Sequence, residues 1–184
     1  MRTLNAAELD QGLDHVRASP SLDGTVELIV ARPAIDRRQI LEVGELDPAA
    51  GLIGDTWGTR PSKRTPDGAP HPDMQLNVIN ARFSALIAPD TDHRALAGDQ
   101  LHLDLDLSEA NLAPGTRLAL GSAVIEITAQ PHRGCAKFAA RFGQDALRLV
   151  NSPAGRELHL RGVNAKVVQA GTVGVGDRVT KLGS

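Results

Sequence analysis

Short runs in which hydrophobic and polar residues alternate recur along this chain, and they limit its fold more than any other feature. The clearest is residues 100–107, with the sequence QLHLDLDL. A period of two places the apolar side chains on one face of a strand, so we expect His102, Asp104 and Asp106 to lie on the other face. Further runs that predict short strands are residues 25–32, 37–46 with a break at Gly44, 74–80, 117–120, 123–129, 158–162, 165–168 and 178–182.

The predicted strands are short, and few of the segments between them have helical spacing. Gly121 and Ser122 separate two strands by a two-residue hairpin signal. Short helices are expected at residues 3–18, 81–88 and 137–142. About six to eight short strands with few helices predict a mainly β fold, a closed or nearly closed β-barrel with a few short helices.

The length of the chain suits one domain that spans residues 1–184 and buries its own core. Its N-terminal helix is expected within residues 1–20, where Asn5 and Glu8 have the spacing of a capping box. No internal repeat or boundary divides the sequence, so we predict a single domain.

Two segments lack the alternating pattern. Residues 51–72 are rich in proline, glycine and charged residues, which predicts a long loop. Long loops inside compact domains are often functional, although such a segment can also be a disordered surface excursion. Residues 171–177 are rich in glycine and predict a turn.

Composition excludes several classes of function. Aromatic residues make up 2% of the chain and the net charge is −2, which argues against a surface that stacks bases or attracts phosphate backbones. No nucleic-acid partner is therefore expected. No apolar run is long enough to span a membrane and the N-terminus lacks the pattern of a secretory signal, so we expect a cytoplasmic protein without a membrane partner.

Cysteine is the most reactive residue type in the chain, and Cys135 is the single cysteine. His132, Arg133 and Lys137 lie close to it in sequence, and a helix is expected to follow; both features lower the pKa of a thiol. As a thiolate, Cys135 could bind a transition metal such as molybdenum, attack an electrophile or carry a persulfide sulfur. The alternative is a small buried core residue, which is the usual role of a lone cysteine.

A set of segments surrounds this cysteine in a recognisable order. The MOSC domain, the molybdenum cofactor sulfurase C-terminal domain, has similar elements in the same order, so the chain beyond residue 50 resembles this family. The matching segments are Gly51-Leu52-Ile53-Gly54-Asp55, Gly98-Asp99-Gln100-Leu101, residues 114–121, Pro131-His132-Arg133-Gly134-Cys135 and residues 171–177.

The resemblance implies a β-barrel of the kind shared with a pyruvate kinase domain, and it places Cys135 at the position of the family's cysteine. By resemblance, the protein would bind molybdenum cofactor or carry and transfer sulfur, with Cys135 as the metal ligand or the persulfide carrier. It would then be a molybdenum-dependent oxidoreductase or a sulfur-transfer protein, with a partner protein that donates sulfur or electrons. Pyridoxal phosphate binding is implied only at the level of the whole family.

The sequence departs from the family pattern at two places. His71-Pro72-Asp73 stands where members have His-Gly-Gly, and Gly98-Asp99-Gln100-Leu101 replaces Gly-Glu-Asn-Leu. Proline removes a backbone donor that a glycine would offer to an anion. An alternative function is therefore a non-catalytic binding or interaction module that keeps the barrel but has lost the cofactor site. A third hypothesis is a thiol enzyme without molybdenum, in which Cys135 is a plain nucleophile.

The residues expected at the site come from the cysteine segment and the two loops that resemble the family. Arg133, His132 and Lys137 would favour the thiolate of Cys135, and the 51–72 loop would cover a small-molecule or cofactor ligand. The residues expected to contact that ligand are Asp55, Trp57, Arg60, His71, Asp99, Gln100, His132, Arg133 and Lys137.

Overall fold

The structure is a computed structural model that describes residues 2–183. The strands are β1 (Asp23–Ala31), β2 (Gln39–Leu41), β3 (Val43–Asp47), β4 (Gly51–Leu52), β5 (Leu76–Asn80), β6 (Leu101–Asp104), β7 (Arg117–Leu120), β8 (Ala123–Ile127), β9 (Val163–Gln169), β10 (Gly171–Gly174) and β11 (Arg178–Lys181). The helices are α1 (Ala6–Arg17), α2 (Ala81–Ile87), α3 (Thr91–Ala95), α4 (Ala136–Phe142), α5 (Gln144–Asn151) and α6 (Pro153–Glu157), with 3₁₀ turns η1 (Trp57–Thr59) and η2 (Pro72–Met74).

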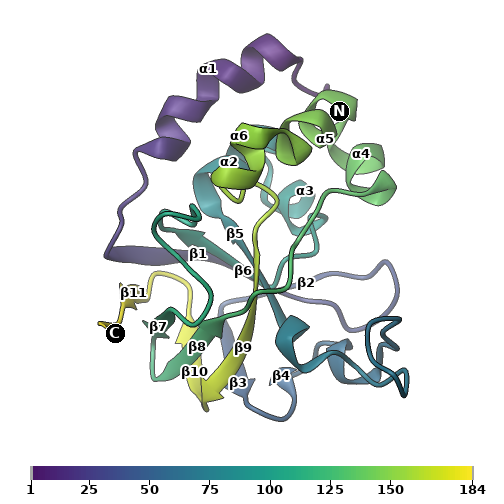
Figure 1. Cartoon of the computed structure of the whole chain (residues 1–184), viewed down its shortest axis with the longest axis vertical. Coiled ribbons are helices and arrows are strands. Elements are labelled where there is room, and N and C mark those ends of the chain that lie inside the picture. The colour runs from purple at the N-terminus through teal and green to yellow at the C-terminus, as the bar shows by residue number, and fades with distance from the viewer. Residues whose placement is uncertain (1, 184) are drawn as a thin grey trace.

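A closed β-barrel forms the centre of the molecule (Figure 1). Within residues 2–183, seven strands follow one another around it in the order β1, β11, β7, β8, β9, β5 and β6, and β6 pairs again with β1. β1 closes the ring by pairing with β11 at Asp23–Thr180 and with β6 at Thr25–Asp104. β5 and β6 are parallel, whereas the other neighbours in the ring are antiparallel, so the barrel is mixed. The predicted fold class is confirmed.

Two hydrophobic clusters hold this arrangement. The barrel interior is aliphatic, with residues such as Ile29, Leu103 and Ile125 fully buried. The second cluster lies between the barrel and the helices, which gather over one end of it (Figure 1). It contains Phe83, Phe138 and Phe142, so all three phenylalanines belong to the helical layer. Since burial of one large apolar side chain contributes roughly 1.5–3 kcal/mol, both clusters stabilise the fold strongly.

A small sheet of β10, β3 and β4 refines two predictions about the glycine-rich segments. The predicted turn is present at residues 175–176 before β11, but residues 171–174 form strand β10, which pairs with β3. Gly171 also passes so close to Ser122 that a Cβ would lie 2.5 Å from its carbonyl carbon. Gly44 lies inside β3, opposite Val173, and the break in the 37–46 run falls at Glu42. Glycine here permits close approach of strands and does not end them.

Two other local predictions were wrong. His102 is buried and its Nδ1 lies 2.9 Å from Ser84 Oγ, because α2 covers the face of β6 that was expected to meet solvent. Residues 158–162 form a turn after α6 and not a strand. Ser152 caps α6 and Pro153 occupies its first turn, which starts a helix. The backbone amides of Leu158 and His159 then donate to the carbonyls of Ala154 and Arg156, so these residues end the helix in a turn.

In contrast, α1 and the β7–β8 hairpin formed as predicted. Asn5 and Glu8 make both hydrogen bonds of a capping box at the start of α1. β7 and β8 pair from Arg117–Glu126 to Leu120–Ala123. None of the helices described between residues 2 and 183 has the length and apolar character needed to cross a membrane.

Candidate functional site

Cys135 lies at the surface, where the segment after β8 enters α4. It is the N-cap residue of α4, but its side chain makes no capping hydrogen bond, so the thiol is left accessible. Asn151 fixes the residue before it, since its side chain donates to the carbonyl of Gly134 and accepts from the amide of Gly134, both at 3.2 Å. A Cβ at Gly134 would lie 2.7 Å from a Val150 methyl, so this close packing of the segment on α5 requires glycine.

Beside Cys135 is a pocket of about 460 Å³, which we call the cysteine groove. Its walls come from the end of β1, the loop after it, the 51–72 loop, the turn before β6, α4, and the turn before β9. Its charged residues are Arg32, Arg38, Arg60, Arg141, Arg161, Lys137 and Asp36. The lining is therefore strongly cationic. Because arginine presents several fixed N–H donors, such a groove suits an oxygen-rich anion.

The floor of the cysteine groove contains two buried ion pairs, of which Arg32–Asp55 is the first. Arg32 donates to Asp55 through Nε at 2.7 Å and through Nη2 at 2.9 Å, and its backbone amide donates to the same carboxylate. Asp55 also accepts from the backbone amide of Trp57. Asp55, predicted to touch a ligand, instead ties the 51–72 loop to the end of β1, and this part of the loop is ordered.

The second buried pair is Arg161–Asp99. Arg161 Nη1 lies 2.9 and 2.7 Å from the two carboxylate oxygens of Asp99, and its Nη2 donates to the carbonyl of Ala97. The guanidinium also lies over the ring of Phe138, 5.1 Å from its centre. Burial raises the pKa of Asp99, and the charge and hydrogen bonds of Arg161 oppose that rise. Asp99, another predicted ligand contact, is fully buried and acts on Arg161.

Gln100 also belongs to the scaffold. It is buried, accepts from the amide of Asn77 and donates to the carbonyl of Gln75, which joins β5 to the start of β6. Asn77 in turn accepts from Arg32 and donates to Asn164 at 2.6 Å. Gln100 is absent from the lining of the cysteine groove, whereas Asn77 contributes to it.

The rim of the groove differs from the floor because its cations are not neutralised by buried carboxylates. The pKa of Arg38 is lowered by burial and by the charges of Arg141, Arg32 and Arg60. The pKa of Arg60 is lowered by burial and by Arg32. Arg38 Nε is buried and has no hydrogen-bond partner among residues 2–183. An anion that entered the groove would relieve this repulsion and supply the partner.

A second pocket of about 300 Å³, the loop pocket, continues the cysteine groove under residues 60–64. The two share Arg32, Arg60 and Asn77 as lining residues. Of the predicted residues, Trp57, Arg60 and His71 line the loop pocket, and Trp57 Nε1 donates to the carbonyl of His71 at 3.2 Å. The 51–72 loop and Cys135 therefore border one continuous groove.

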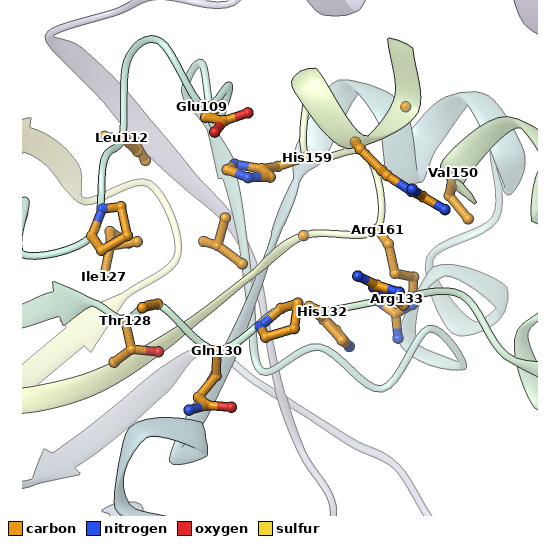
Figure 2. A pocket seen from close by; sticks show the side chains of 17 residues that line it. Glu109, Leu112, Ile127, Thr128, Gln130, His132, Arg133, Val150, His159 and Arg161 are labelled. Carbon is orange, nitrogen blue, oxygen red and sulfur yellow. The ribbon is translucent and has the colours of Figure 1, made fainter. Parts of the chain in front are cut away.

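His132 and Arg133 line a different pocket, which does not include Cys135 (Figure 2). We call it the β8 pocket. Burial, followed by the charges of Arg161 and Arg32, lowers the pKa of His132 well below its ordinary value. The ring is therefore neutral near pH 7, which corrects the expectation that His132 supplies positive charge to a Cys135 thiolate. Lys137 does line the cysteine groove with Cys135.

Four arginines of the groove, Arg32, Arg38, Arg141 and Arg161, were not among the residues expected at the site. Arg32 follows a clear strand and precedes a proline, which marks the end of a barrel strand but equally a surface charge. Arg161 was assigned to a strand that does not form. Arg141 is on α4, where its Nη2 lies 3.2 Å from Asp36 and its Nη1 donates to Leu96, contacts that no local pattern announces.

Comparison with known proteins gives the following matches. The family model described as MOSC domain matches residues 87–180, more than half of the chain. Among solved structures, the YUAD protein from Bacillus subtilis superposes with a TM-score of 0.61 at 14% identity, over 86% of this chain and 94% of that one. YiiM from Escherichia coli has a TM-score of 0.55 at 18% identity, over 87% of this chain and 70% of that one.

A further YiiM structure, from Geobacillus stearothermophilus, has a TM-score of 0.52 at 13% identity, over 89% of this chain and 75% of that one. At these identities the likeness concerns the fold. No curated protein sequence matches this chain.

Proposed function

Because this chain belongs to the MOSC domain family, we propose that the cysteine groove binds molybdenum cofactor, an anionic and oxygen-rich ligand, with Cys135 next to the metal. The observation that carries the proposal is the meeting of an accessible thiol with five arginines in one groove. Arginines placed this densely repel one another, so the groove is arranged for an anion and not for its own stability.

The donor set also fits a metal that arrives with other ligands. Among residues 2–183, no three His, Cys, Asp or Glu side chains gather closely enough to hold a metal ion. Cys135 alone could not retain a bare ion, but thiolate sulfur suits a molybdenum that a pterin already holds. When bound, the cofactor would supply two-electron redox chemistry or accept a sulfur atom.

The roles of the chain's own residues follow from their positions. Arg38, Arg60 and Arg141 would bind the anionic groups, and Trp57 and His71 would shape the neighbouring loop pocket. Arg32 and Arg161, which are paired with Asp55 and Asp99, would support the floor of the groove beneath the ligand. Cys135 would offer sulfur at the exposed edge of the groove.

A second candidate function, sulfur carriage, rests on the same accessible thiol. The Cys135 thiolate would attack the outer sulfur of a donor's persulfide, so that a new S–S bond forms on Cys135 and the donor leaves as a thiolate. No net oxidation occurs in this exchange. The groove cations would stabilise the persulfide anion, and a partner protein would provide the donor.

The features expected of a non-catalytic module that lost the site are a buried cysteine and no adjoining pocket. Cys135 is exposed and lines the cysteine groove. Geometry thus favours a ligand-binding role over the module.

The test is purification from a host that makes molybdenum cofactor, followed by measurement of bound molybdenum and of the oxidised pterin's fluorescence. We expect both to co-purify with the wild type. Cys135→Ser removes one ligand from a metal that the pterin still holds, so molybdenum and pterin should fall together and only in part, while Arg38→Gln with Arg141→Gln should lose both. Arg148→Gln, an exposed arginine on α5, is the matched control and should change neither.

Absence of both molybdenum and pterin from the wild type would contradict cofactor binding. The sulfur-carrier function is tested separately, by mass spectrometry after incubation with glutathione persulfide. A mass increase of one sulfur that maps to Cys135 supports it, and no increase contradicts it.

A further inference from the structure

The β8 pocket differs from the cysteine groove and does not include Cys135. It encloses about 360 Å³, within the range of small-molecule sites. Its walls come from the end of β8, the loop around Glu109, α5, α6 and the turn before β9. Arg161 lines both cavities, but its guanidinium is already held by Asp99. The β8 pocket is therefore a second cavity with its own free polar groups.

Arg133 lies at one end of the pocket (Figure 2), and Arg156 also lines the pocket. Neither has a carboxylate within ion-pair distance among residues 2–183. Unpaired guanidinium groups that share a cavity favour an anionic ligand such as a carboxylate, which arginine can bind with two parallel hydrogen bonds.

The other end accepts hydrogen bonds. His159 Nδ1 lies 2.7 Å from the carbonyl of Leu107, so in the neutral ring Nδ1 carries the proton and Nε2 is a bare acceptor. The Glu109 carboxylate, also in the lining, makes no ion pair within the part of the chain that the structure describes. In Figure 2, Glu109 and His159 project on the side of the pocket opposite Arg133.

The backbone at His159 follows from the end of α6. Its φ of +46° lies in the left-handed region, and the amides of His159 and Leu160 donate to the carbonyls of Arg156 and Gly155, an arrangement that ends many helices. The hydrogen bond to Leu107 holds the ring in this conformation. Between the two ends the wall is apolar, from Leu112, Ile127, Val150 and Val163.

We propose that the β8 pocket binds a small amino carboxylate, with its carboxylate at Arg133 and Arg156 and its ammonium group at Glu109 and His159. Because the wall between the two ends is apolar, the part of the ligand between its charged groups is a hydrocarbon chain or ring. This site is independent of the cofactor groove and goes beyond the function proposed for it.

The experiment is a ¹⁵N-NMR titration of the full chain with 6-aminohexanoate and 4-(aminomethyl)benzoate. Hexanoate and benzylamine, which lack one of the two charged groups, serve as comparison probes. We expect shifts at the lining residues with a Kd of about 1 mM or tighter for at least one amino carboxylate, and at least tenfold weaker binding of both comparison probes.

Variants then locate the interaction. Glu109→Gln and Arg156→Gln alter exposed side chains, so the fold should be retained, and each should weaken the amino carboxylate about tenfold. Arg38→Gln and Cys135→Ser, which disable the cysteine groove, should leave this affinity unchanged.

Three results would overturn the inference: no shifts at the pocket with either amino carboxylate, equal binding of hexanoate, or loss of binding in Arg38→Gln. Failure of molybdenum to bind would leave it standing.

Discussion

The floor and the rim of the cysteine groove are built from the same residue type and behave differently. On the floor, Arg32 and Arg161 are each held by a fully buried carboxylate at 2.7 Å. On the rim, Arg38 and Arg60 lack such a carboxylate, and neighbouring arginines and burial lower the pKa of both.

The difference separates residues that hold the site from residues that can bind a ligand. A buried arginine that is already paired uses its hydrogen-bond donors within the scaffold. An arginine that is repelled by neighbouring cations is stabilised when an anion binds beside it. A cationic lining should therefore be judged by the pairing of each charge and not by the number of arginines.

The largest effect should follow from breaking the floor. Asp99→Ala leaves Arg161 buried without its counter-charge, and we expect a loss of about 3–5 kcal/mol in the free energy of unfolding. Chemical denaturation measures it. Asp36→Ala, an exposed carboxylate on the rim, is the control and should cost less than about 1 kcal/mol. Equal losses of stability in Asp99→Ala and Asp36→Ala would contradict the distinction between floor and rim.

The floor should also make stability depend on pH. His132 lies 3.5 Å from Asp99, and its pKa is held well below the ordinary value of about 6.5. As pH falls through about 6.5, the unfolded chain binds a proton that the folded chain refuses, so stability falls with a slope approaching 1.4 kcal/mol per pH unit.

Denaturation between about pH 6 and pH 4.5 checks this contribution. His132→Gln should reduce the slope by about that amount, whereas His15→Gln, on the exposed face of α1, should leave it unchanged. The buried His102, whose pKa is about 3, contributes the same sign to all three proteins and cancels in the comparison. If the slope of stability against pH is unchanged in His132→Gln, the His132 ring binds a proton in the folded protein as readily as in the unfolded chain.

On the rim, the effect should appear in binding and not in stability. Arg38→Gln should weaken binding of an inorganic anion such as molybdate about tenfold, because one charge-assisted contact is lost. The free energy of unfolding should change by no more than about 0.5 kcal/mol. Calorimetric titration gives the affinity. A destabilised Arg38→Gln with normal anion affinity would move Arg38 from the rim to the scaffold.

The last effect concerns the segment that carries Cys135 between the two regions. Asn151→Ala removes two hydrogen bonds to Gly134 and should cost about 1–2 kcal/mol. The rate of Cys135 modification by a thiol reagent should change as well, because the segment loses its anchor. If stability falls and the modification rate is unaltered, the position of the thiol does not depend on Asn151.

Local signals in the sequence predicted much of the fold. The capping box at Asn5 and Glu8 and the hairpin at Gly121 act over a few residues, so they are visible without the tertiary structure. The alternation in β6 was also clear, but the alternation could not show that α2 would bury His102 as well. Strand β10 was missed because it pairs with the distant β3 and its Gly171 packs against Ser122, contacts that no local pattern shows.

The site was predictable at its centre and not at its floor. Cys135 and the 51–72 loop do border the same groove. However, Asp55 and Asp99 were expected to face a ligand, since a carboxylate in a loop gives no local sign that a distant arginine will bind it. Their partners, Arg32 and Arg161, lie 23 and 62 residues away in the chain.

Because β1 pairs with β11, the barrel can close only after the last strand has been synthesised. Asp23 and Thr180 are neighbours in the barrel although they are separated by most of the chain. When β1 through β9 have been synthesised, the nascent sheet still has two unpaired edges and no closed interior. The ring can be completed only after β11 emerges, and such long-range closure is characteristic of slow folding. Until that moment the open edges of β1 and β7 are the surfaces on which a chaperone, or an unwanted second copy, would act.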